Sequence, residues 1–217
     1  MSDVSFDSIS DIFDVLLAAH EGGLVLDEYE KTVFFNAAHK QIVKEYYLGA
    51  SLSNTPFDSS EETKRHMSYY LRQKEITSSE NPSDHIAKYT LPNDVWYIVS
   101  EHLKLSGKTY PVVAATQDTF DKVLQNPFKN TLSKRRAIRI EGATSDTNTT
   151  IRIAFNKGSN TENPTYECLY IVEPQEISLT DTTTFKIKIH SSLLENIIRR
   201  AIELAIQSRA GIQKSNV

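Results

Sequence analysis

The hydrophobic pattern of the chain changes its period part-way along the sequence, and this change constrains the fold more than any other feature. Apolar residues recur every three or four positions in much of the first 80 residues, as they do on one face of a helix. From residue 138 onward they alternate with polar residues, as in strands with one buried face. The helical period returns over residues 191–208. The pattern therefore predicts an α+β protein.

Three helices are predicted in the N-terminal part. The first follows a capping box formed by Ser8 and Asp11, the second spans about 27–48, and the third spans about 59–76. The apolar face of the first helix consists of Ile9, Ile12, Phe13, Leu16 and Leu17. That of the second consists of Val33, Phe34, Ala37, Ala38, Ile42 and Tyr46. This second face is wide, so we expect it to pack on more than one neighbour.

Strands are predicted in the second half of the chain. Three alternating segments, 138–141, 151–155 and 185–189, are expected to be half-buried. The segment 166–172 is apolar on both faces and is expected to be more central. The run VWYIV at 95–99 is compatible with either a buried strand or a short helix, because its pattern has no period.

Together these elements predict a single domain over residues 1–217, built as a helical bundle with a small antiparallel β-sheet and a C-terminal helix. Residues 1–80 are mainly helical in this prediction, and 87–190 contain the sheet. Residues 191–208 form the closing helix and 209–217 a polar tail. The helices that begin near residues 27 and 59 are expected to pack with the closing helix, because each has an apolar stripe to bury.

Composition excludes several classes of protein. The only cysteine, Cys168, rules out an intrachain disulfide and a cysteine zinc site. The net charge of −4 argues against a general cationic attraction to nucleic acid. No segment has the ~20 apolar residues that a membrane span needs, and the N-terminus lacks the pattern of a signal peptide. We therefore expect a soluble protein of a reducing compartment.

The motif search favours no catalytic, metal or cofactor site. The segment SGKT at 106–109 is similar to the end of a phosphate-binding loop, but the required glycine is replaced by His102, which favours a plain hairpin or loop. The six histidines include no pair at metal-ligand spacing. Cys168 lies within an apolar strand, where a thiol is usually a small buried hydrophobe.

A basic run is the one local anomaly of charge. It consists of Lys129, Lys134, Arg135, Arg136 and Arg139, with no acidic residue between them. Such a run fits a surface for phosphate or for an acidic partner, and it equally fits a solvated loop beside an edge strand. We take Lys134, Arg135, Arg136 and Arg139 as the candidate partner interface. Glu61 and Glu62 are candidates for the opposing rim on a neighbouring subunit or ring protein.

The order of several segments along the chain is more specific than any one motif. In order they are LDEYEKTVFFNAAHKQIVKEYY, SSEETKRHMSYYLRQKEI, YTLPNDVWYIVSE, TQDTFDKVLQNPFKN, KRRAIRIEG, YECLYIVEPQEISL and LLENIIRRAIELAI. From about residue 24 to 206 this order resembles the ring proteins of the neck and tail of crAss-like bacteriophages. These virion proteins are related in architecture to the head-to-tail adaptors of short-tailed phages.

The resemblance implies a subunit of a dodecameric ring in the virion, without enzymatic activity or cofactor. Its implied partners are other copies of itself, the portal protein or other ring and tail proteins, and packaged DNA that passes through the lumen without specific recognition. It implies no membrane, and a subunit that folds in the host cytoplasm before assembly. Two alternatives stay open: a nucleic-acid-binding accessory phage protein that uses the basic run, and an enzyme whose site assembles from scattered polar residues.

Overall fold

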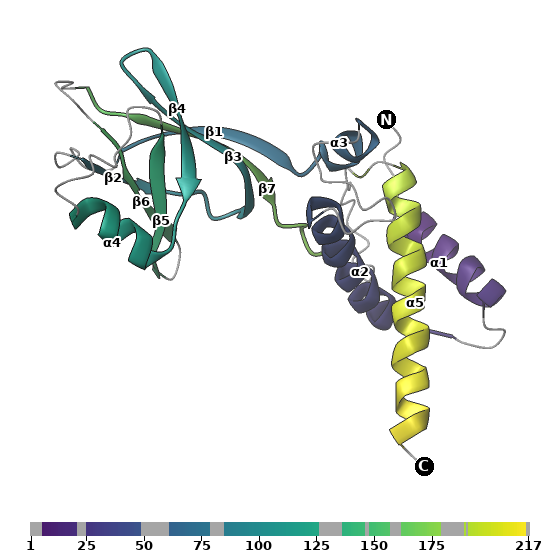
Figure 1. Ribbon diagram of the computed structural model, residues 1–217. Coiled ribbons are helices and arrows are strands. Elements are labelled where there is room, and N and C mark those ends of the chain that lie inside the picture. The colour runs from purple at the N-terminus through teal and green to yellow at the C-terminus, as the bar shows by residue number, and fades with distance from the viewer. Residues whose placement is uncertain are drawn as a thin grey trace. The chain divides into compact units, whose positions relative to one another are not determined.

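A computed structural model defines the fold of the chain (Figure 1). It describes residues 6–20, 25–48, 61–78, 85–125, 136–145, 148–156, 162–178, 189 and 191–215. The chain forms two compact units. The first, which we call the helical unit, consists of Met1–Tyr70 and Pro174–Val217. The second, the sheet unit, is the continuous segment Leu71–Glu173, so it is inserted within the sequence of the helical unit.

Four helices make up the described part of the helical unit. They are α1 (Phe6–His20), α2 (Glu28–Leu48), α3 (Glu61–Met67) and α5 (Ser191–Ser215). Helix α5 packs on both α1 and α2, and α3 contacts α2. The buried stripe of α5 consists of Leu193, Leu194, Ile197, Ile198, Ala201, Ile202 and Ala205. The predicted packing of the second helix on the C-terminal helix is therefore confirmed.

The ends of the helices agree only in part with the sequence prediction. Helix α2 begins as predicted, since the Asp27 carboxylate accepts a bond from the Glu30 amide at 2.7 Å and the Glu30 carboxylate accepts one from the Asp27 amide at 3.2 Å. Helix α1 already begins at Phe6, so the prediction of Ser8 as its cap is wrong. Helix α5 continues to Ser215, past the predicted end at residue 208 and through most of the predicted polar tail.

The second half of the third predicted helix is a strand. Helix α3 ends at Met67, and strand β1 (Leu71–Thr77) follows after a short turn. Strand β1 pairs along its whole length with β7 (Thr165–Val172), from Leu71 opposite Ile171 to Thr77 opposite Thr165. The segment has residues that are acceptable in a helix, and the hydrogen bonds to a distant strand override that local preference.

The sheet unit contains a seven-stranded mixed sheet, so the prediction of a helical bundle with a small antiparallel sheet is wrong. Its other strands are β2 (Ile86–Thr90), β3 (Val95–Leu105), β4 (Lys108–Ala114), β5 (Ala137–Ser145) and β6 (Asn148–Ala154). The strand order is β1-β7-β3-β4-β5-β6-β2. Only β4 and β5 pair in parallel, and all other neighbours are antiparallel. Strand β7 lies inside the sheet, as its apolar sequence predicted.

The sheet curls into a half-barrel (Figure 1). At its two edges, the Ser78 hydroxyl after β1 donates to the Lys88 carbonyl of β2 at 3.1 Å. Inside the curl, the ring of Tyr89 on β2 lies 5.4 Å from that of Tyr166 on β7, although these strands are far apart in the strand order. The buried residues of this inner core are Ala87, Tyr89, Leu91, Leu103, Leu105, Val112, Ala137, Ile151, Ile153, Phe155, Tyr166, Cys168 and Tyr170.

A second, smaller core lies on the outer face of the same sheet. Helix α4 (Gln117–Gln125) covers β5 and β6 there, and its Phe120 packs with Ile138, Ile140 and Ala154. The Arg152 guanidinium lies 5.5 Å from the centre of the Phe120 ring. This part of the sheet is therefore covered on both faces, which the alternating sequence pattern did not predict.

Two ambiguous segments are resolved by the sheet. The run VWYIV opens strand β3, so the strand alternative is correct. The segment SGKT forms the turn of the β3–β4 hairpin, where Ser106 and Gly107 have φ angles of 50° and 72°. Two successive residues of positive φ are typical of a two-residue hairpin turn. The hairpin interpretation is confirmed. The predicted strand at 185–189 lies outside the described residues except for Ile189, which is buried.

Candidate functional site

The structure separates the described members of the basic run. Arg136 is exposed just before β5, whereas the side chain of Arg139 within β5 is only 8% exposed. Lys129, Lys134 and Arg135 lie outside the described residues. The role of the run in a partner interface therefore stays a prediction, and within it Arg139 has a second role inside the fold.

Arg139 joins three strands from within the half-barrel. Its Nε lies 2.8 Å from Glu101 Oε2 on β3, and its Nη1 lies 2.9 Å from Glu141 Oε1 on β5. The Tyr166 hydroxyl on β7 donates to the same Glu101 oxygen at 2.8 Å. The Glu101 side chain is 10% exposed, so this carboxylate is largely shielded from solvent. Because β4 lies between β3 and β5 in the sheet, the ion pair links strands that are not neighbours.

The pairing of β5 with β6 explains why Arg139 points inward. Ile138 and Ile140 face α4 on the outer side, and Arg139 lies opposite Ile153, a residue of the inner core. Sequence alternation placed Arg139 on a polar outer face, and that prediction is wrong. The isoleucines of β5 are indeed buried, but they are buried under a helix on the outer side of the sheet.

The electrostatics of this cluster favour a structural role. Burial disfavours the charged Arg139, but Glu101 and Glu141 outweigh that effect, so the Arg139 pKa is raised. Burial and the nearby Glu101 charge raise the pKa of the Tyr166 hydroxyl, which keeps it a neutral donor. Burial likewise raises the pKa of the neighbouring Cys168 thiol to about 11, so the thiolate is not populated near neutral pH. Arg139 therefore remains charged in its pair with Glu101, and Tyr166 and Cys168 remain neutral beside it.

The described histidines do not gather into a metal site. Within the described ranges, no group of three or more His, Cys, Asp or Glu side chains is placed to hold a metal ion. His39 of α2 is buried in the helical unit, where its Nε2 lies 2.6 Å from the Tyr70 hydroxyl and its Nδ1 has no hydrogen-bond partner. Burial, with a smaller contribution from Lys40, lowers the His39 pKa from 6.5 to about 4.

We expect this buried histidine to make the helical unit less stable in mild acid. The unfolded chain takes up a proton on His39 below pH 6.5, whereas the folded chain resists it down to about pH 4. The contribution is therefore fully present above pH 6.5 and is lost as the pH falls towards 4, by about 3 kcal/mol in all. His39→Gln, which keeps a hydrogen-bonding group for Tyr70, should have a shallower fall in unfolding free energy over this range. Equal pH slopes for the two proteins in urea titrations would contradict the assignment.

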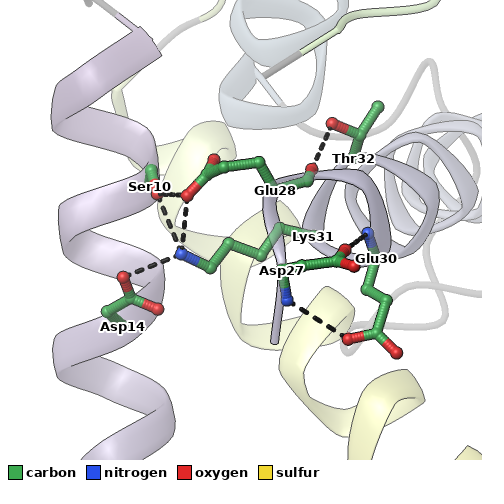
Figure 2. A network of polar contacts seen from close by, with 7 residues as sticks. All are labelled: Ser10, Asp14, Asp27, Glu28, Glu30, Lys31 and Thr32. Carbon is green, nitrogen blue, oxygen red and sulfur yellow. Dashed lines mark hydrogen bonds and ion pairs between the residues drawn. The ribbon is translucent and has the colours of Figure 1, made fainter. Parts of the chain in front are cut away.

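Helices α1 and α2 are joined by a buried lysine (Figure 2). Lys31 of α2 is 4% exposed, and its Nζ bonds to Asp14 at 2.8 Å, to Glu28 at 2.9 Å and to the Ser10 hydroxyl at 3.0 Å. The Ser10 hydroxyl in turn donates to the same Glu28 oxygen at 2.8 Å. Burial disfavours the charged lysine, but the two carboxylates raise its pKa overall. Lys31 precedes Phe35 by four residues and so lies on the buried stripe of α2, a position the sequence analysis missed.

The outward faces of the same two helices are apolar. The exposed large hydrophobic residues of the helices are Ile12 at 41%, Val15 at 69%, Tyr29 at 70%, Val33 at 45% and Leu48 at 59%. Ile12 and Val33 were both predicted to be buried, and that prediction is wrong. The buried faces are narrower than the sequence indicated: Ile9, Phe13 and Leu17 in α1, and a stripe around Phe35 and Ile42 in α2. Apolar residues outside such a stripe remain in contact with solvent.

None of the helices within the described ranges is both long and apolar enough to span a membrane.

Comparison with known proteins gives matches along nearly the whole chain. A family model described as phage tail ring protein 3/4 matches residues 4–216. Ring protein 3 of Bacteroides phage crAss001 is 28% identical over an alignment of 225 positions, which covers 92% of this chain and 94% of that protein. Ring protein 4/5 of the same phage is 26% identical over an alignment of 211 positions, which covers 88% of this chain and 87% of that protein.

Proposed function

Because the chain belongs to the phage tail ring protein 3/4 family, we propose that it is a structural protein of the virion whose copies close into a ring. The observation that carries this proposal is the extent of the family match, which spans residues 4–216. The resemblance to crAss-like phage ring proteins seen in the sequence is thereby confirmed. It was apparent over about residues 24–206, and the family match adds α1 and the end of α5.

In the proposed virion, the ring is dodecameric and lies in the neck or tail of a short-tailed phage, between the portal and the tail. Its partners are other copies of the chain, then the portal protein or other ring and tail proteins. Packaged DNA passes through the lumen without specific recognition. The net charge of −4 supports this last point, since a subunit that is acidic overall has no general attraction for phosphates. The subunit folds in the host cytoplasm, needs no cofactor and catalyses no reaction.

A subunit of a closed ring must be rigid, and the sheet unit contains internal links that would make it so. Every subunit of a closed ring must present its two contact surfaces at a fixed angle, since a small error repeated around the ring prevents closure. The Glu101–Arg139 pair and the Tyr166 hydroxyl bond hold three strands of the half-barrel together. We propose that this internal link serves the rigidity of the subunit, with no role in chemistry.

The proposal is tested on the purified chain and on virions. Native mass spectrometry of the chain should give a closed oligomer with one dominant copy number, and imaging of the virion neck should show the same number. A chain that stays monomeric at every concentration and is absent from the particle would contradict the proposal. Binding of the chain to DNA with a steep dependence on salt would favour the alternative, a nucleic-acid-binding accessory phage protein.

For the basic run we expect an effect on assembly without an effect on folding. Arg135→Glu combined with Arg136→Glu reverses two charges that precede β5 in the sequence, and rim charges set the register and rate of association more than its strength. The variant should have the wild-type thermal midpoint but a reduced copy number in virions. Lys108→Glu, an exposed position in the β3–β4 hairpin, is the control and should be incorporated normally.

Three outcomes of this experiment are distinct. Loss of incorporation supports Arg135 and Arg136 as part of the interface, with Arg139 retained inside the fold. Normal assembly with poor genome retention means that the run binds DNA phosphates. Normal assembly and normal infection contradict both roles and leave a solvated loop.

A further inference from the structure

The chain passes between its two units twice, because the sheet unit is inserted within the sequence of the helical unit. The first passage, which we call the entry crossing, joins Tyr70 to Leu71. The second, the return crossing, joins Glu173 to Pro174. Within the sheet unit the two crossings are neighbours, since Leu71 at the start of β1 pairs with Ile171 near the end of β7. The sheet unit therefore begins and ends at adjacent points of one strand pair.

Within the helical unit, the return crossing is held by helix α2. The side-chain amide of Asn36 bonds to both backbone groups of Ile177, a buried residue. Its Nδ2 donates to the Ile177 carbonyl at 2.7 Å, and its Oδ1 accepts from the Ile177 amide at 3.0 Å. One turn further along α2, the Lys40 ammonium lies 3.0 Å from the Glu176 carboxylate. Because an amide side chain has both a donor and an acceptor, Asn36 pairs with this segment as a neighbouring strand would.

The entry crossing is held by the same turn of α2. The Tyr70 hydroxyl lies 2.6 Å from His39 Nε2, and the two rings meet edge to face with their centres 5.6 Å apart. The Tyr70 amide also donates to the Met67 carbonyl at the end of α3, at 2.9 Å. Asn36, His39 and Lys40 are spaced by three and four residues, so their side chains share one face of the helix. We call these three residues the anchor turn.

Little chain lies between the anchored residues of the helical unit and the paired strands of the sheet unit. At the entry crossing, Tyr70 is bonded to the anchor turn and the next residue, Leu71, already pairs with β7. At the return crossing, β7 ends at Val172 and Glu176 is bonded to the anchor turn, so residues 173–175 lie between them. One of these three is a proline, which fixes its own φ angle and restricts the residue before it.

We propose that the anchor turn of α2 holds both crossings and confines bending of the chain between the two units to the Tyr70–Leu71 peptide and residues 173–175. Hinges in proteins are a few residues at the ends of elements that absorb changes in φ and ψ, and these residues have that position. Asn36 has the largest part in this role, because an ion pair as exposed as that of Lys40 with Glu176 contributes little. The proposal goes beyond the proposed function and does not depend on whether copies of the chain form a ring.

Hydrogen exchange of the full chain tests the role of Asn36. Asn36→Asp keeps the size of the side chain but places a carboxylate oxygen, in place of the donor, against the Ile177 carbonyl. The Ile177 amide should then exchange at least about tenfold faster, while α5 and the strands of the sheet unit keep their rates. Asn36→Ala, which removes both bonds without adding a charge, should give the same local pattern.

A matched control lies on the same helix. Gln41→Glu makes the same change from amide to acid, but there the side-chain oxygen is the bonded atom, since it accepts from Arg200 at 3.2 Å. This variant should exchange like the wild type. Equal rates for the Ile177 amide in Asn36→Asp and Gln41→Glu would overturn the proposal. Faster exchange throughout α2 and α5 would also overturn it, because Asn36 would then support the whole helical unit instead of one crossing.

Distances between two spin labels measure the bending itself. Gln207→Cys on α5 and Val113→Cys on β4 put one label on an exposed position of each unit, and the native Cys168 is buried. In this labelled background Asn36→Asp should broaden the distribution of distances, whereas Gln41→Glu should leave it unchanged. A distribution of unchanged width in Asn36→Asp, with the Ile177 amide exchanging faster, would mean that the anchor turn does not limit bending.

The entry crossing is tested by Tyr70→Phe, which removes the hydroxyl bonded to His39 and keeps the ring. Combined with Asn36→Asp in the labelled protein, it should broaden the distances beyond those of Asn36→Asp alone, because both crossings are then loosened. If the added substitution has no effect on the width, His39 does not hold the entry crossing and the proposal of one anchor for both crossings is wrong.

Discussion

Replacing Ile198 by aspartate is expected to unfold the helical unit under conditions in which the wild-type protein is stable. Ile198 is 1% exposed on the buried stripe of α5, the helix that packs on both α1 and α2. An aspartate there either loses its hydration as an ion or must be protonated to fold. The substitution also removes the apolar contacts of the isoleucine. We expect the free energy of unfolding to fall by about 4 kcal/mol or more.

Denaturant unfolding followed by the helical circular dichroism signal measures this effect. Gln207→Asp places the same side chain on an exposed position of α5 and is the control. It should change the unfolding free energy by less than about 1 kcal/mol, as exposed substitutions usually do. If Ile198→Asp and Gln207→Asp had the same midpoint, α5 would not pack through this stripe.

The second large effect is expected at the ion pair inside the half-barrel. Arg139→Met removes the cation and leaves Glu101 buried, with only the Tyr166 hydroxyl as a described partner. Breaking a buried pair on one side costs about 3–5 kcal/mol, because the remaining charge is no longer compensated. The loss should appear as a lower unfolding midpoint of the sheet unit, measured by the fluorescence of Trp96, which lies on β3.

A second substitution separates the buried charge from simple packing. Adding Glu101→Gln removes the uncompensated charge and keeps an acceptor for Tyr166, so the double variant should recover a large part of the lost stability. Lys104→Met is the control, since Lys104 forms ion pairs with Glu75 and Glu167 on the surface and should cost much less. If the double variant is as unstable as Arg139→Met alone, the guanidinium acts through its packing volume and the proposed electrostatic role is wrong.

Sequence patterns predicted best those elements whose signals are local. The start of α2 at Asp27 depends on a capping box within four residues, and its end near residue 48 on the same helical period. The helix predicted from residue 191 is present for the same reason, since its apolar period is a signal within a few turns of one helix. Family membership was also visible in the sequence, because the order of its segments does not depend on knowing the fold.

Elements that need a distant partner were missed or left ambiguous. Residues 71–76 were assigned to a helix, but they belong to strand β1 because this segment pairs with β7, whose residues lie about 90 to 100 positions further on. The small antiparallel sheet of the prediction is a seven-stranded mixed half-barrel for the same reason. Strand pairing joins separate parts of the chain, and no local window contains both partners.

Single residues of the candidate site also divide into properties set by the sequence and properties set by the tertiary structure. The sequence by itself determined the charge of Arg139, the apolar character of Ile12 and Val33, and the family to which they belong. Only the tertiary structure decided that Arg139 is buried against Glu101, and that Ile12 and Val33 are exposed. The physical reason is that burial depends on which face of an element another element covers. That choice is made by packing between segments far apart in the chain, so a residue's own neighbours in sequence do not specify it.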